Sequence, residues 1–183
     1  MLKLAKEISI LFPEFYLAGG TALMLKYRHR ISTDLDFFSE KAFSFLKLAS
    51  KVRKYFSVEG ETRGEDNLDL FVDGIRISFV FFPFKNIKPL ERYKGVKKAD
   101  DYDIFLNKIY AAGRRVDPRD PYDVAFLLKK YNWQKEIVKR DFIKKFPDQS
   151  FEIYLGAVLS FEDYPEIDEW VKETLFEFAG VEL

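Results

Sequence analysis

Cysteine is absent from the 183 residues, and histidine occurs once, as His29. Without thiols the chain can build neither a disulfide framework nor a thiolate metal site, and one imidazole excludes metal centres made of several histidines. No run approaches the eighteen or more apolar residues that a membrane-spanning helix needs, and the first residues lack the pattern of a secretory signal peptide. The sequence therefore predicts a cytoplasmic globular protein that does not enter a membrane.

The formal net charge is zero, but the charge is spread unevenly along the chain. From Asp148 onward there are ten acidic residues and one basic residue, whereas the preceding part has 20 acidic and 29 basic residues. One interpretation is a nucleic-acid-binding body with an acidic tail that shields it or meets a partner. The other is a set of solvated helical faces, and the two have equal weight from charge alone.

The periodicity of apolar residues predicts a mixed α/β part followed by an all-helical part, with the change near residue 100. In the first part we expect helices over 2–12, 21–27 and 42–55 and strands over 15–18, 34–38, 57–62, 67–72 and 75–82. Asp73-Gly74 should close a hairpin, the strand after it is apolar enough to be central, and residues 83–98 read as turns. Helices are expected over 101–112, 119–131, 133–146, 150–161 and 166–179, with glycine caps at Gly113 and Gly180.

Two short segments near the N-terminus combine into a pattern with chemical meaning. Gly19-Gly20-Thr21 stands between a strand and a helix, where glycines let the backbone approach a phosphate and the first helical amides attract anions. Asp34 and Asp36 stand two apart on the next strand, so their carboxylates should face the same side. Two carboxylates beside a phosphate cradle predict a site for a nucleotide and Mg²⁺ (or Mn²⁺), bound by Asp34 and Asp36.

Each of these segments also has a structural interpretation. The aspartates can be solvated or cap a helix, and the glycine turn with Thr21 as its cap occurs in most α/β proteins. The Asp-x-Asp motif of sugar-nucleotide glycosyltransferases is a rival, which the glycine turn and the small size of the chain disfavour. After the turn, Arg30 and Ser32 are suited to bind phosphate as a guanidinium fork and a hydroxyl donor.

The order and spacing of four motifs resemble the nucleotidyltransferase superfamily that includes DNA polymerase beta, and within it the AbiEii/AbiGii-type toxins of abortive-infection and toxin–antitoxin systems. The resemblance covers roughly residues 15 to 130. The motifs are Gly19-Gly20-Thr21-Ala22-Leu23, His29-Arg30-Ile31-Ser32, Asp34-Leu35-Asp36-Phe37-Phe38, and Lys108 followed by Arg119-Asp120-Pro121-Tyr122-Asp123.

The resemblance implies a nucleotidyltransferase fold, a mixed sheet flanked by helices, with residues 1–99 as its core. Residues 100–183 would be a helical part that completes the active site within a single compact unit. It makes Lys108 a ligand of the triphosphate and Asp120 an active-site residue, and Asp123 is a further nucleotide-binding candidate. Without the resemblance, Lys108 would be a surface lysine, and the two aspartates would be caps at a helix start.

One position departs from the pattern of many polymerase-beta-like enzymes, which carry a third carboxylate on a later strand facing the aspartate pair. The corresponding residue here is Ser78, and Asp69 on the preceding strand is a candidate substitute. The expected function is transfer of NMP from an NTP to RNA (tRNA in some relatives) or to a protein side chain, with an antitoxin protein as partner. The alternatives are a nucleotide-binding regulatory protein without transferase activity and an interaction domain that binds no nucleotide.

Overall fold

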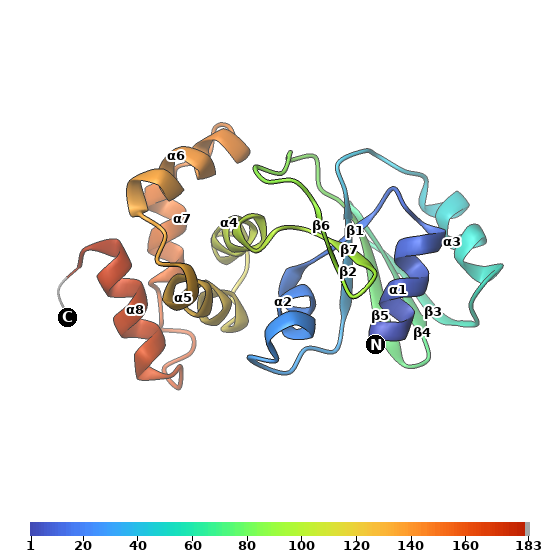
Figure 1. Ribbon diagram of the computed structural model, residues 1–183, viewed down its shortest axis with the longest axis horizontal. Helices are drawn as coiled ribbons and strands as arrows, with labels where there is room; N and C mark the ends of the chain where they lie inside the picture. Colours follow the sequence, from blue (N-terminus) through green and yellow to red (C-terminus); the bar gives the residue numbers. More distant parts are fainter. Residues whose placement is uncertain (182–183) are drawn as a thin grey trace. The chain divides into compact units, whose positions relative to one another are not determined.

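The computed structural model describes residues 1–181 and divides the chain into two compact units, Met1–Asp100 and the residues from Asp101 onward. The first unit is mixed α/β and the second is helical (Figure 1). None of the helices in the described residues has the length and the apolar content needed to span a bilayer.

The first unit is organised around one mixed sheet with the strand order β3-β4-β5-β2-β1-β7-β6. β1 pairs antiparallel with β2 and parallel with β7, while β2 pairs parallel with β5. The strands are β1 (Tyr16–Ala18), β2 (Leu35–Ser39), β3 (Val58–Arg63), β4 (Asn67–Val72), β5 (Ile75–Phe81), β6 (Glu91–Tyr93) and β7 (Val96–Lys98). β5 is central, as its apolar composition predicts.

The β4–β5 connection confirms the predicted hairpin. Asp73 and Gly74 have φ angles of 51° and 70°. Positive φ at both central residues is the type I′ geometry that matches the twist of paired strands, and glycine adopts it without steric cost.

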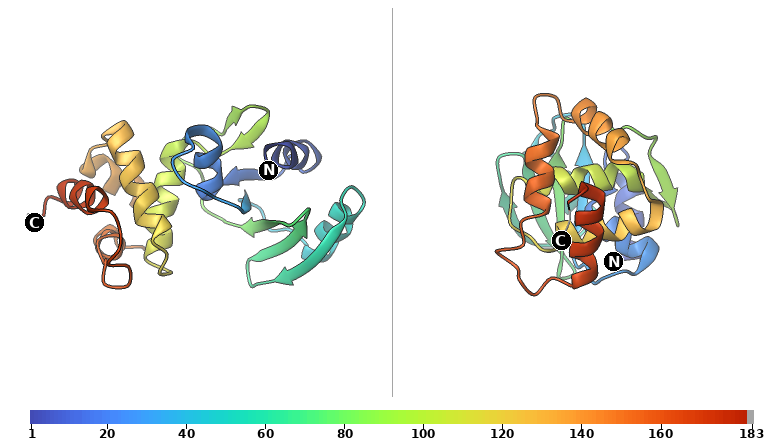
Figure 2. Two further views of the ribbon diagram at one scale, coloured as in Figure 1. Left: turned by 90° about the horizontal axis from the view of Figure 1, so that it is seen from below. Right: turned by 90° about the vertical axis from the view of Figure 1, so that its left-hand side faces the viewer.

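The helices of the first unit lie on opposite sides of its sheet. α1 (Leu2–Leu11) and α3 (Phe45–Arg53) cover one face, and α2 (Gly19–Tyr27) lies on the other (Figures 1 and 2). On the face beneath α1 and α3, the ring of Phe79 contacts those of Phe12, Phe15 and Phe37, and all four are fully buried. Burying such a side chain contributes roughly 1.5–3 kcal/mol, so this face holds the core of the unit. The opposite face carries both the polar residues Asp36 and Ser78 and the aromatic pair Tyr16 and Phe38.

The prediction for residues 83–98 was wrong, because this segment contains β6 and β7. Lys94 and Gly95 form their turn with φ angles of 47° and 85°. Three-residue strands rich in lysine and arginine carry almost no local strand signal. β7 is stabilised instead by tertiary pairing with β1, and the buried ammonium of Lys98 lies 2.5 Å from Glu91 Oε1.

Residues 101–181 contain a bundle in which α4 packs against α5 and α7, and α5 packs against α8. Its helices are α4 (Asp101–Ala112), α5 (Arg119–Tyr131), α6 (Lys135–Lys145), α7 (Phe151–Val158) and α8 (Glu169–Ala179). A fully buried ion pair joins α4 to α6, with 2.5 Å between Lys145 Nζ and Asp103 Oδ1. Tyr102 Oη donates to Asp141 Oδ2 at 3.0 Å in the same interface.

The two predicted glycine caps have different outcomes. Gly180 caps α8 with a left-handed φ of 71°, as expected. Gly113 follows α4, but it is not among the glycines with positive φ. A Cβ on Gly113 would lie 2.3 Å from a ring carbon of Tyr154, so this glycine admits the α7 tyrosine rather than turning the chain.

Candidate active site

The turn between β1 and α2 brings the backbone of Gly19 against the carboxylate of Asp36. Gly19 has a φ of 70°, and a Cβ at this position would lie 2.7 Å from Asp36 Oδ2. β1 and β2 are paired so that Ala18 is opposite Asp36, which explains the approach. Gly19 is therefore required here both for its backbone conformation and for the space it leaves to the aspartate.

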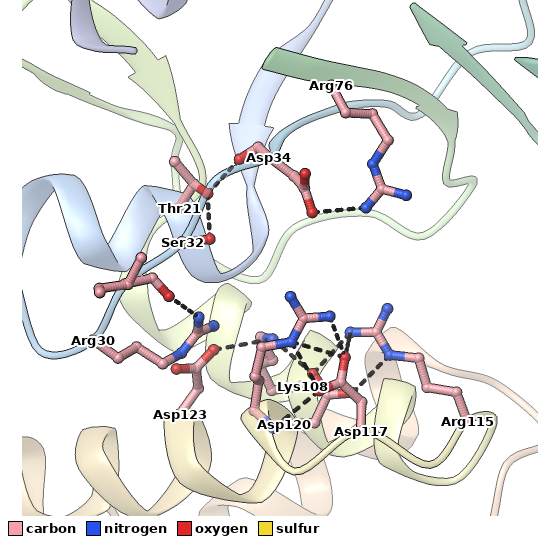
Figure 3. Close-up of polar contacts among 12 residues, drawn as sticks. Thr21, Arg30, Ser32, Asp34, Arg76, Lys108, Arg115, Asp117, Asp120 and Asp123 are labelled. Carbon is pink, nitrogen blue, oxygen red and sulfur yellow. Dashed lines mark hydrogen bonds and ion pairs between the residues drawn. The ribbon is translucent and has the colours of Figure 1, made fainter. Parts of the chain in front are cut away.

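Asp34 lies just before β2, and two hydroxyls hold its backbone in place. Thr21 Oγ1 donates to the carbonyl oxygen of Asp34 and lies 2.6 Å from Ser32 Oγ (Figure 3). Because the single proton of the Thr21 hydroxyl is used on the carbonyl, Ser32 is the donor in the second hydrogen bond. Thr21 is 1% exposed, so in this structure it positions Asp34. Phosphate binding by Thr21 and Ser32 stays a prediction.

The side chain of Asp34 has a cationic neighbour that the sequence analysis missed. Arg76 Nη2 on β5 lies 2.7 Å from Asp34 Oδ2 (Figure 3). Arg76 lies in the apolar run of β5, two residues before Ser78. The available signal was its place two residues before Ser78 on the same face, because a cation in an otherwise apolar central strand needs an anionic partner.

Three polar residues form a row across the sheet beside the aspartate pair. Asp36 on β2 is opposite Ser78 on β5, and Ser78 is opposite Asp69 on β4. Partners in register point to the same side of a sheet, so all three face away from the aromatic core. Ser78 thus occupies the predicted position opposite Asp36. Asp69 is one strand further away and accepts a hydrogen bond from Asn67 Nδ2 at 2.9 Å.

The two carboxylates at this site suit a divalent cation that takes its remaining ligands from water or phosphate. Asp34 and Asp36 lie on the same face as Arg76 and Ser78, and both are partly exposed, whereas Leu35 and Phe37 between them are fully buried. Residues 1–181 contain no cluster of three or more side chains arranged as a metal site. Mg²⁺ is often held by one or two carboxylates and completed by water and phosphate oxygens, which agrees with two aspartates.

The second unit contains the other group of predicted site residues. Lys108 on α4 lies 2.6 Å from Asp120 Oδ1 and 3.0 Å from Asp123 Oδ2, both on α5 (Figure 3). Lys108 is 6% exposed, and both aspartates are fully buried. The ammonium does not reach solvent as a surface lysine does, and the two carboxylates are not simple helix caps. Together the three side chains form a buried ion cluster.

Arginines and a further aspartate continue this cluster toward the surface. Arg115 donates to Asp120 Oδ2 from Nε at 2.8 Å and to Asp120 Oδ1 from Nη2 at 2.9 Å. Asp117 accepts hydrogen bonds from the backbone amide and the guanidinium of Arg119. Burial alone would raise the pKa of Asp117, but the hydrogen bonds from Arg119 outweigh it and leave the pKa below the usual value. Asp117 preceded the recognised motif and was missed.

The predicted residues thus fall into one group in each unit. The first unit brings together Gly19, Thr21, Ser32, Asp34 and Asp36. Gly20 is buried in the first turn of α2. The guanidinium of Arg30 donates to the carbonyl of Ile31 at 3.0 Å. Lys108, Asp120 and Asp123 come together in the second unit, and their part in the same active site stays a prediction.

The architecture resembles solved structures over nearly the whole chain. JHP933 from Helicobacter pylori matches with a TM-score of 0.57 at 21% identity, covering 98% of this chain and 86% of that one. MenT4, the nucleotidyltransferase toxin Rv2826c from Mycobacterium tuberculosis H37Rv, matches with a TM-score of 0.56 at 15% identity, covering 99% and 83%. At these identities the likeness establishes the fold, and it confirms the predicted nucleotidyltransferase fold.

Sequence comparison supplies the family. The protein aq_aa25 of Aquifex aeolicus (strain VF5), described as uncharacterized, is 32% identical over 169 residues, which are 87% of this chain and 82% of that protein. The sequence profile of the family described as "Nucleotidyl transferase AbiEii toxin, Type IV TA system" matches residues 3–97. The chain therefore belongs to the AbiEii nucleotidyl transferase toxin family.

Proposed function

We propose that this protein is a metal-dependent nucleotidyltransferase that transfers NMP from an NTP to an acceptor and acts as the toxin of a toxin–antitoxin or abortive-infection system. The observation that carries the proposal is the placement of Asp34 and Asp36. Thr21 and Ser32 hold the first, and the second lies against Gly19 at the start of α2. This arrangement brings the carboxylate of Asp36 beside the N-terminus of α2, where the first helical amides attract anions, and Asp34 precedes it by two residues on the same face.

Asp34 and Asp36 would hold Mg²⁺ (or Mn²⁺) in this proposal. The ion would neutralise charge on the triphosphate and lower the pKa of the acceptor hydroxyl. The amides of Gly19 and Gly20 would bind phosphate oxygens, since no side chain caps the start of α2. Arg30 and Ser32 follow on the connection from α2 to β2, and we assign them to the phosphates as well. Ser32 would then donate its hydroxyl proton to phosphate in place of Thr21.

The second unit would contribute Lys108, Asp120 and Asp123. Lys108 is neutralised by two buried carboxylates in this structure, so its expected contact with the triphosphate requires these ion pairs to rearrange. Arg115, whose side chain is 54% exposed while it holds Asp120, offers a positive charge closer to solvent. We propose that Lys108 keeps Asp120 in place and that Arg115 assists in binding phosphate.

We propose RNA, including tRNA, as the acceptor class, with a protein side chain as the alternative, and an antitoxin protein as the partner. The test is incubation of the full chain with each α-³²P-labelled NTP, Mg²⁺ and total tRNA. Asp36→Asn should abolish label transfer and Mg²⁺-dependent nucleotide binding without unfolding the protein. Asp73→Asn, the same change in the exposed β4–β5 turn, is the matched control and should retain both.

One observation favours the second candidate, a nucleotide-binding protein without transferase activity. Ser78 stands opposite Asp36 where many related enzymes place a third carboxylate. In that case the wild-type protein would bind NTP in a manner that depends on Asp36, yet label would appear neither in RNA nor in protein. Transfer of label onto tRNA that requires Asp36 would exclude this candidate.

A further inference from the structure

The ion pair between Arg76 and Asp34 places a permanent positive charge on one of the two carboxylates proposed to bind the metal. Arg76 Nη2 lies 2.7 Å from Asp34 Oδ2. The guanidinium carries a full positive charge. A divalent cation that approaches Asp34 therefore meets a like charge at the same carboxylate.

Arg76 is not fully used by this contact. The ion pair involves one N–H group and one carboxylate oxygen, and the side chain is 41% exposed. Among residues 1–181, the buried Nε of Arg76 is one of the few buried side-chain nitrogens with no hydrogen-bond partner. A guanidinium has five donors in a fork that suits phosphate oxygens. The guanidinium therefore has N–H groups left with which it can bind an anion.

We propose that Arg76 acts first as the counterion of Asp34 and then as a ligand of the nucleotide's phosphates when the metal–nucleotide complex binds. This inference rests on the proposed function and adds a residue to it. In the protein without nucleotide, Arg76 would oppose binding of a divalent cation. The negative triphosphate would draw the guanidinium away from Asp34, so that metal and nucleotide bind together. Arg76 is thus a coupling residue between the two ligands.

The position of Arg76 on the sheet supports this role. It precedes Ser78 by two residues on β5, and Ser78 is opposite Asp36, so Arg76 and both aspartates share one face. A third carboxylate at position 78 would offset the arginine, whereas the serine found there does not. The charge of the pair Asp34 and Asp36 is therefore partly cancelled before any ligand binds.

The experiment compares Mn²⁺ binding to the full-length wild-type protein, Arg76→Gln and Arg76→Met, measured by electron paramagnetic resonance of free Mn²⁺. Without nucleotide, both variants should bind Mn²⁺ about tenfold more tightly, because a like charge roughly 5 Å away is removed. With Mn²⁺ saturating, both should bind NTP about tenfold more weakly, because one charge-assisted contact to phosphate is lost. A purely structural ion pair would not move the two affinities in opposite directions.

Three further proteins make the result decisive. Arg76→Lys keeps the charge and should bind Mn²⁺ alone as the wild type does. Arg63→Gln removes an arginine that pairs with Glu61 on the edge strand β3, and it should change neither affinity. If Arg76→Gln and Arg76→Met bind Mn²⁺ alone no better than the wild type, the inference is overturned. Asp36→Asn tests the proposed function separately. If Asp36→Asn binds Mn²⁺–NTP as well as the wild type does, the proposed function fails, and the role of Arg76 fails with it.

Discussion

A Cβ atom on Gly19 would lie 2.7 Å from Oδ2 of Asp36, which is closer than such atoms approach without something moving. The glycine of the turn and the second aspartate of the strand are therefore one structural feature, although 16 positions separate them in the sequence. The chain reverses through α2 and returns as β2 alongside β1, which brings the carboxylate onto the glycine backbone. The placement of the Asp36 carboxylate and the phosphate binding proposed for this turn therefore involve the same residue.

Gly19→Ala should remove metal binding with a modest loss of stability. The methyl group would push the carboxylate of Asp36 away, and the φ of 70° would add strain of roughly 1–2 kcal/mol. Gly74→Ala is the matched control, because Gly74 also has a φ of 70° but no atom lies within 4 Å of its Cβ position. Both variants should unfold at lower urea concentration, and Gly19→Ala alone should lose Mn²⁺ binding. If the two variants bind Mn²⁺ with equal affinity, Asp36 is not a ligand of the metal.

Ser78→Asp should create a stronger metal site. Position 78 is buried and lies between Asp36 and Asp69, so a carboxylate there adds a third negative charge to the row. We expect a rise in Mn²⁺ affinity of about tenfold, or about 1.4 kcal/mol. The variant should also be less stable without metal, since like charges repel. Ser78→Asn controls for size, and calorimetry with Mn²⁺ measures the effect. Unchanged affinity would show that position 78 does not face the metal.

Lys108→Met should destabilise the protein strongly rather than weaken nucleotide binding alone. Removing the ammonium leaves Asp120 and Asp123 buried with one cation fewer, and breaking a buried ion pair costs roughly 3–5 kcal/mol. Lys144→Met changes an exposed lysine on α6 and should be nearly neutral. Urea unfolding monitored by tryptophan fluorescence reports both. A stable Lys108→Met variant with weaker binding of triphosphate would favour the direct phosphate contact predicted from the sequence.

Asp117 should make the stability of the protein depend on pH in the acidic range. Its pKa is lowered, since hydrogen bonds from Arg119 to the carboxylate outweigh burial. The unfolded chain therefore binds a proton at higher pH than the folded chain, and the stabilisation present above about pH 4 is lost as the pH falls through the folded pKa. Asp117→Asn should be less stable at pH 7 and show a shallower loss between pH 4 and 2. Parallel curves for the two proteins would contradict this.

The sequence predicted the parts of the fold that have strong local signals. α4 and α5 begin and end where their apolar periodicity and acidic first turns place them, and α5 also has a basic last turn. Asp73-Gly74 forms the expected hairpin. The strands β6 and β7 were missed, because their pairing with distant strands stabilises them and no local pattern shows that. Strand order also had to come from the structure, apart from the central place of β5.

The motifs identified the candidate site residues, but they did not show how these residues interact. Spacing predicted that Asp34 and Asp36 face one side, and the family resemblance indicated Ser78 as the residue opposite the pair. The place of Arg76 in an apolar strand indicated an anionic partner, but nothing local identified that partner as Asp34. Nothing local showed that Lys108 is buried between Asp120 and Asp123. Ion pairs between residues tens of positions apart depend on packing, and a lysine beside an apolar face reads the same whether it is exposed or buried.

The acidic C-terminal segment offers a last test, because its charge and its packing can be changed separately. α8 buries Val171, Leu175 and Ala179 and packs against α5, so truncation after Pro147 should unfold the helical unit. The aromatic residues Trp170, Phe176 and Phe178 of α8 are only half-buried. The packing interpretation rests instead on the apolar stripe of α8.

Neutralising the exposed acids without truncation tests the electrostatic interpretation. A variant with Glu162→Gln, Glu166→Gln and Glu173→Gln should keep the fold, because all three side chains are exposed. If the segment masks an RNA-binding surface, RNA affinity should rise in this variant and fall steeply with added salt. We expect unchanged RNA affinity, because the buried apolar residues of α8 give the segment a structural role that does not involve RNA. Filter binding of tRNA at several salt concentrations, with Lys172→Gln as the control of opposite charge, distinguishes the two outcomes.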